Sequence, residues 1–197
     1  MTTCDHRQAA ARGFTLIELV IVLAVLGVLV ATSVPLAGAV VMADRRAEAN
    51  RELSDLAMAL DAHWFDHASF PANLTAAGFL GTYLHGGVGN TAVLDPFGAG
   101  QGYVYAVDTV AGTATVYSRG ENGRDNGANN EELVLRVTAA VPATRRTWSR
   151  LRIVVEVLAN HIEAGGSVSG SWPTVRAAIG LGPAYDTDGW GLSLIHI

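Results

Sequence analysis

The chain has little cysteine and no strong charge for its length of 197 residues. Cys4 is the only cysteine, so no disulfide can stabilise a domain built from the rest of the chain. The formal net charge is -5 and the basic residues form no extended run, which argues against a nucleic-acid surface. No Ser/His/Asp set and no pair of carboxylates in an apolar setting can be picked out, so we expect no enzyme activity.

Two histidines lie at a spacing that is typical of zinc ligands. His63 and His67 lie four residues apart, as zinc ligands on a helix often do. The glutamate that follows the first histidine in a metalloprotease is absent, and so is a third ligand at a fixed distance. We therefore interpret these residues as surface histidines near a helix end.

A long uncharged run dominates the amino-terminal part of the chain, from Leu19 to Ala43. A helix of this length can cross a hydrocarbon core of roughly 30 Å. Glu18 lies at the edge of the run, where a carboxylate costs on the order of a few kcal/mol unless it is paired. Pro35 removes a backbone donor inside the run, which predicts a kink.

The residues before this run form a specific motif. Gly13 directly precedes Phe14, and the order Gly-Phe-Thr-Leu-Ile-Glu leads into the apolar run. This order resembles the prepilin signature of type IV pilins and type II secretion pseudopilins. The resemblance implies that a prepilin peptidase cuts after Gly13, that Phe14 becomes the N-methylated terminus, and that Glu18 pairs with the terminal amine of a neighbouring subunit during assembly. An ordinary signal anchor with a tolerated edge carboxylate is the alternative.

Residues 44–66 continue with an amphipathic helical pattern. Leu53, Leu56, Leu60 and Trp64 recur at spacings of three and four, which predicts one helix from about Phe14 to His67. The alternating segments 102–107 and 113–118 predict a hairpin, and residues 133–137 predict a third strand. The predicted fold class is α+β, with a long amino-terminal helix packed on a small antiparallel sheet, followed by a second, incomplete helical repeat.

Residues 119–132 form a polar loop rich in Gly, Asn and acidic side chains. With the turn Asp95-Pro96-Phe97-Gly98 and a Tyr-x-Tyr strand before it, this loop resembles that of the major pseudopilin of type II secretion. In that group the loop binds calcium, so the resemblance implies a calcium site here. Its ligands would be Asn122, Asp125, Glu131 and Glu132. The match is imperfect, because Asn and Glu stand where the family usually has Asp, and a solvated surface loop is the alternative.

Residues 145–191 repeat features of residues 45–98. Ser69-Phe70-Pro71 parallels Ser171-Trp172-Pro173, and the turn at Asp95 parallels Asp188-Gly189-Trp190-Gly191. The second copy reaches no strands, so we expect it to be poorly packed. Residues 192–197 resemble a translated sequencing-library adapter, so we expect the natural protein to continue past residue 191. The expected segments are a leader (1–13), a membrane helix (14–43), a head domain (44–139), a partial second head-like repeat (140–191) and an adapter-derived tail (192–197).

These resemblances imply a structural pseudopilin subunit of a type II secretion-type filament that drives protein export across the outer membrane. The partners would be prepilin peptidase, other copies and minor pseudopilins in a helical filament, an inner-membrane assembly platform and the membrane, with no nucleic acid. Arg7 and Arg12 in the leader favour a cytoplasmic amino terminus and a periplasmic head on a single-pass bacterial inner-membrane protein. The alternatives are a major or minor type IV pilus subunit for adhesion or motility, or a membrane-anchored binding protein.

Overall fold

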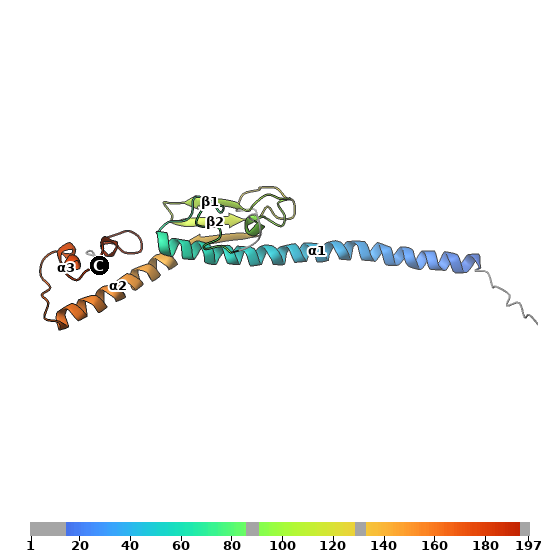
Figure 1. The fold of residues 1–197 in the computed structure, drawn as a ribbon. Helices are drawn as coiled ribbons and strands as arrows, with labels where there is room; N and C mark the ends of the chain where they lie inside the picture. The colour runs from blue at the N-terminus through green and yellow to red at the C-terminus, as the bar shows by residue number, and fades with distance from the viewer. Residues whose placement is uncertain (1–14, 86–90, 129–132, 194–197) are drawn as a thin grey trace, which may run out of the picture. The chain divides into compact units, whose positions relative to one another are not determined.

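The computed structural model describes residues 15–85, 91–128 and 133–193, without the side chains of residues 32–36 (Figure 1). The chain divides into two units, Met1–Asp44 and Arg45–Ile197, which are described separately.

Helix α1 extends over Leu16–His67, which confirms the prediction of one long helix. In the first unit its large apolar side chains are exposed, for example Leu19 at 56% and Leu29 at 55%. The backbone is helical at Pro35, but the side chain there lies outside the described residues, so the kink stays a prediction. In the part of the chain that the structure describes, no helix combines the length and the apolarity needed to cross a membrane.

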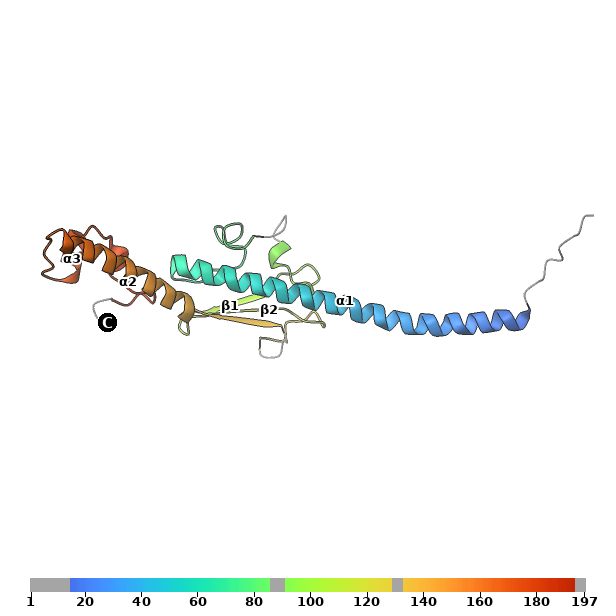
Figure 2. The same ribbon diagram turned by 90° about the horizontal axis from the view of Figure 1, so that it is seen from below.

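In the second unit, the rest of α1 buries one face against an antiparallel sheet (Figure 2). The strands are β1 (Val104–Asp108), β2 (Thr113–Tyr117) and β3 (Val134–Thr138), in the order β1-β2-β3. Ala106 pairs with Thr115, which in turn pairs with Arg136 on β3. The side chains of alternate strand residues therefore point toward the helix. The predicted α+β class and all three predicted strands are confirmed, with bounds shifted by one or two residues.

The core between α1 and the sheet is apolar. Its centre is made by Leu56, Leu60 and Val116, all fully buried, with Phe79 from the connecting segment. A short 3-10 turn, η1 (Thr91–Val93), leads from this connecting segment toward β1. Burying these large side chains contributes roughly 1.5–3 kcal/mol for each one, which makes this face of α1 the main source of stability in the head.

Helix α2 (Ala140–Glu163) begins almost directly after β3. The backbone N–H of Ala139 donates to Gly112 O at 2.8 Å, and Ala139 and Ala143 pack against Trp64 near the end of α1. Two short elements follow, α3 (Trp172–Ala178) and the 3-10 turn η2 (Pro183–Tyr185). The described chain after η2 forms one bridge, between Thr187 and Ser193. The carboxyl-terminal part of the second unit is therefore helical.

Candidate processing, assembly and loop sites

The amino-terminal end of α1 holds the predicted assembly carboxylate. Glu18 Oε2 accepts hydrogen bonds from the backbone N–H and the Oγ1 hydroxyl of Thr15, both at 2.8 Å. Thr15 Oγ1 in turn accepts from the backbone N–H of Glu18 at 3.3 Å. This is a capping box, which satisfies free N–H groups at a helix start and places a carboxylate at the positive end of the helix dipole.

The capping box was missed in the sequence reasoning, although Thr15-x-x-Glu18 is its signature. In the single chain, Glu18 therefore has local partners that a neighbouring subunit's amine would join or replace. Gly13 and Phe14, the predicted cleavage and methylation residues, lie outside the described residues.

The polar loop after β2 is anchored at its first residues by one buried carboxylate. Asp95 Oδ1 accepts hydrogen bonds from Ser118 Oγ at 2.7 Å and from Phe97 N at 3.0 Å. Asp95 Oδ2 accepts from the backbone N–H of Arg119 at 2.7 Å. Gly98 completes the turn, and a Cβ there would approach Gln101 O to 2.7 Å, so a larger residue would displace the backbone. The turn therefore fixes where the loop starts.

Of the four predicted calcium ligands, the structure places two. Asp125 Oδ1 accepts from Tyr117 Oη at 2.8 Å and from Gly127 N at 3.0 Å. The hydrogen bond from Tyr117 is the main reason that the pKa of Asp125 lies below its ordinary value, with the Gly127 N–H adding to it, so this carboxylate stays charged. Asn122 Oδ1 accepts from Arg124 N at 2.8 Å.

These contacts shape the loop, but they do not by themselves make a metal site. Glu131 and Glu132, the other two predicted ligands, lie outside the described residues. Among the residues that are described, no three His, Cys, Asp or Glu side chains come together closely enough to hold a metal ion. Calcium binding therefore stays a proposal that rests on the resemblance of the loop.

His63 and His67 form an aromatic cluster with Tyr83. The ring centroids of the two histidines are 4.5 Å apart. Tyr83 Oη donates to Asp66 Oδ2 at 2.7 Å and lies 3.1 Å from His67 Nε2, while His63 Nδ1 donates to Ser69 O at 2.9 Å. Each contact fixes the end of α1 against the segment that follows it, which is a structural role.

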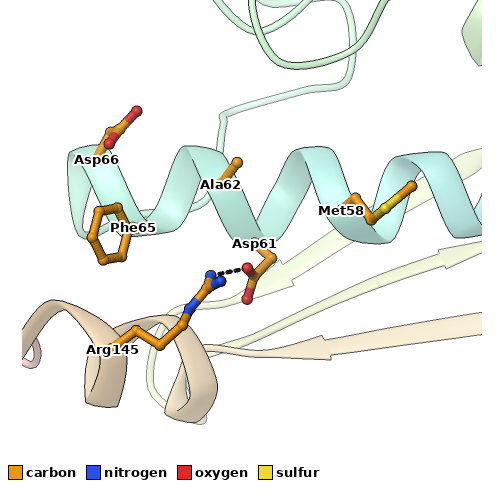
Figure 3. A pocket seen from close by; sticks show the side chains of 6 residues that line it. All are labelled: Met58, Asp61, Ala62, Phe65, Asp66 and Arg145. Atoms are coloured by element: carbon orange, nitrogen blue, oxygen red, sulfur yellow. Dashed lines mark hydrogen bonds and ion pairs between the residues drawn. The ribbon is translucent and has the colours of Figure 1, made fainter.

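A groove of about 590 Å³ lies where α2 meets α1, lined by Met58, Asp61, Ala62, Phe65, Asp66 and Arg145 (Figure 3). Arg145 forms an ion pair with Asp61, and its guanidinium carbon lies 5.6 Å from the centre of the Phe65 ring. Both contacts hold α2 to α1, because guanidinium groups bind carboxylates and aromatic faces together. Arg145 and Asp61 are thus paired with each other, and Asp66 already accepts a hydrogen bond from Tyr83 Oη.

Helix α1 thus exposes large apolar side chains in its first half and packs one face of its second half on a small antiparallel sheet. The family model of the prokaryotic N-terminal methylation motif matches residues 9–34. This motif is the hallmark of the type IV pilin and pseudopilin family, and the chain carries it at its amino-terminal end. No curated protein and no solved structure matches the chain.

The methylation motif confirms the prepilin signature predicted from residues 13–18. A pilin-type motif implies processing by prepilin peptidase and assembly into multimeric filaments, and it is typical of membrane-anchored structural proteins. It is common to pilins and pseudopilins, so it does not separate secretion from pilus systems.

Proposed function

We propose that the chain is a structural pseudopilin subunit of a type II secretion-type filament that drives protein export across the outer membrane. The observation that carries the proposal is that the methylation motif, at residues 9–34, runs directly into the exposed apolar half of α1. Large apolar side chains are exposed at about half or more of their surface over residues 16–30 and at Val40 and Val41. Apolar surface of this extent needs lipid or neighbouring helices to cover it, and small residues such as Gly27 and Gly38 allow helices to approach closely.

The preference for secretion rests on the head. The Asp95 turn, the segment Tyr103-Val104-Tyr105 at the start of β1, and the anchored polar loop follow each other in the order of a major pseudopilin. In this proposal the loop binds calcium through Asn122, Asp125, Glu131 and Glu132. A hard cation with several oxygen ligands would hold a loop that has no disulfide to hold it.

The partners in this proposal follow from the same assignment. Prepilin peptidase cleaves after Gly13, and the new terminus at Phe14 is methylated. Other copies and minor pseudopilins surround the apolar half of α1 in the filament, above an inner-membrane assembly platform. The amino terminus is cytoplasmic and the head periplasmic, in a bacterial inner membrane.

The test is complementation in two bacterial hosts. One lacks the major pseudopilin of its secretion system, and the other lacks the major pilin of its type IV pilus. Restored protein secretion in the first host alone supports the proposal, whereas restored pili in the second host alone supports the pilus alternative. If the chain stays uncleaved and unmethylated in both hosts, the result supports the third alternative, a membrane-anchored binding protein.

A variant pair makes the test specific for assembly. Glu18→Ala removes the carboxylate that would meet the terminal amine of a neighbour, so cleavage should persist while filaments are lost. Glu48→Ala removes a carboxylate from the same helix in the head and should leave filaments intact. Equal loss in both variants would contradict the role given to Glu18.

A further inference from the structure

Helix α2 has two apolar faces, and among the residues that the structure describes only one of these faces is buried. The inner face carries Ala143, Thr147 and Val154, which are buried. The outer face carries Val141, Trp148, Val155 and Ile162 at intervals of seven residues, with exposures of 61%, 69%, 64% and 53%. Single exposed apolar residues are ordinary, but four large ones aligned along one helix form a continuous surface.

The outer face has the pattern of a helix-pairing seam. Thr144, Leu151 and Leu158 follow the first three of these residues at a spacing of three. Val, Trp, Val and Ile therefore alternate with Thr, Leu and Leu over three heptads. Thr144 is the one polar member, and its hydroxyl already donates to Ala140 O at 2.7 Å. Its methyl group is therefore free to pack in the seam.

Charge along α2 favours an antiparallel pair. Its four arginines lie within residues 145–152, whereas both of its glutamates, Glu156 and Glu163, come after them. A parallel neighbour would place like charges side by side, and an antiparallel neighbour places opposite charges together. With Leu151 opposite Val155 of the second copy, the exposed Arg152 of each copy comes close to Glu156 of the other.

Side-chain size favours the same arrangement. In the antiparallel register Trp148 faces Leu158 of the other copy, and Thr144 faces Ile162. In a parallel register the two Trp148 rings would face each other and overfill one layer of the interface. The two Thr144 side chains would face each other in another layer and leave a gap.

We propose that α2 pairs in antiparallel fashion with α2 of a second copy of this chain, through the heptad face defined by Val141, Thr144, Trp148, Leu151, Val155, Leu158 and Ile162. This inference rests on α2 and is independent of the secretion role. The four most exposed side chains would bury roughly 450 Å² on each copy. Two copies together bury about 900 Å², which is below the roughly 1,200 Å² at which stable specific interfaces begin. The pair is therefore weak in dilute solution and needs the local concentration of a shared micelle or membrane.

A two-fold pair is closed, so it cannot propagate along a polar filament. If the chain is a filament subunit, the α2 pair belongs to subunits that have not yet assembled.

The test is site-specific disulfide cross-linking of the full chain in detergent micelles, in a Cys4→Ser background. Two differently tagged copies are co-expressed, one with Thr144→Cys and the other with Ile162→Cys, and are treated with a mild oxidant. The mixed dimer should form at least about ten-fold faster than either same-site dimer, because a disulfide needs Cβ atoms about 4 Å apart. In this register the two copies of residue 144 are separated by 18 residues, or about 27 Å.

Two controls separate specific pairing from crowding. Ile153→Cys lies on the opposite side of α2 and should not cross-link. Val155→Glu places a charge in the seam and should abolish the mixed dimer without changing the circular dichroism melt, whereas Ile153→Glu should leave the mixed dimer intact.

Three results would overturn the inference. Same-site dimers that dominate would show parallel packing. Cross-linking of Ile153→Cys at the same rate would show crowding only. The absence of any cross-link, with the helix folded, would show that another partner covers this face, such as a sheet like the one that covers α1.

Discussion

Asp95 Oδ1 accepts a hydrogen bond of 2.7 Å from Ser118 Oγ across 23 positions of sequence. Both residues are buried, with exposures of 3% and 0%. Because Asp95 also accepts from the backbone N–H groups of Phe97 and Arg119, one carboxylate joins the turn before β1 to the end of β2. Hydrogen bonds to a charged acceptor in a buried setting are among the stronger ones in proteins.

Asp95→Ala should lower the free energy of unfolding by about 2–4 kcal/mol, because it leaves several buried donors without an acceptor. Urea denaturation of the chain in detergent, followed by tyrosine and tryptophan fluorescence, measures the change. Ser118→Ala removes one donor only and should cost about 1 kcal/mol. Asp55→Ala, at an exposed carboxylate on α1, is the control, and an Asp95 variant no less stable than this control would contradict the role of the turn.

The turn at Asp188 has the same hydrogen-bond pattern as the turn at Asp95. Trp190 N donates to Asp188 Oδ1 at 2.9 Å, as Phe97 N does to Asp95 Oδ1 at 3.0 Å. The backbone bond from the fourth residue of the turn to the first is also present in both, at 3.3 Å and 2.8 Å. The two turns therefore share these two hydrogen bonds, while the repeat over residues 145–191 stays a prediction.

The Asp188 turn sits against α2 so closely that it requires glycine. Gly189 N donates to Thr147 Oγ1 at 2.8 Å, and a Cβ on Gly189 would overlap the carbonyl of Ala143. Arg150 adds hydrogen bonds to the carbonyls of Thr187 and Asp188, at 2.6 and 2.9 Å.

Gly189→Ala should therefore detach this turn from α2 and speed hydrogen exchange of the amide groups in residues 182–193. Gly182→Ala is the matched control, since a Cβ there meets nothing within 4 Å. Amide exchange followed by mass spectrometry measures both variants. Equal protection in the two would show that the turn does not depend on its contact with α2.

Helices and strands could be predicted from the sequence because one face of each element is buried. The apolar residues on that face therefore recur with the period of the helix or the strand. Leu53, Leu56 and Leu60 repeat at helical spacing and are buried as expected. The contacts that decide the sites could not be predicted in the same way, because they join residues far apart in sequence. Ser118 donates to Asp95, and Ala143 packs on Trp64, because the tertiary fold brings these distant segments together. The capping box of Thr15 and Glu18 is local and could have been found.

Glu52 gives a pH-dependent contribution to stability. Tyr103 Oη donates to Glu52 Oε2 at 2.6 Å in a partly buried setting. Burial is the main reason that the pKa of Glu52 lies above its ordinary value of 4.5; the Tyr103 hydrogen bond opposes this effect, and nearby carboxylates add to it. A folded pKa above the unfolded one means that stability is present at low pH and is lost as pH rises through the folded pKa.

Glu52→Gln keeps an acceptor for Tyr103 but cannot ionise. We expect it to melt a little above the unmodified chain near pH 8 and at the same temperature near pH 4. The difference should be small, because Glu52 is only partly buried and solvent screens its charge. Glu48→Gln, on the same helix, is the comparison. A lower melting temperature for Glu52→Gln near pH 8 would reverse the sign derived from burial.

Calcium should stabilise the full chain in detergent if the loop of residues 119–132 is a metal site. At a free concentration about 100 times the dissociation constant, the gain in unfolding free energy is about 2.7 kcal/mol, and a chelator should reverse it. Asp125→Asn should remove most of the response, because an amide is a weaker ligand than a carboxylate for a hard cation. The exposed control Asp55→Asn should respond as the unmodified chain does. A melt unaffected by calcium, or a full response in Asp125→Asn, would remove calcium from this loop and with it the main reason to prefer a secretion pseudopilin. The match to the N-terminal methylation motif would stand, because it rests on residues 9–34.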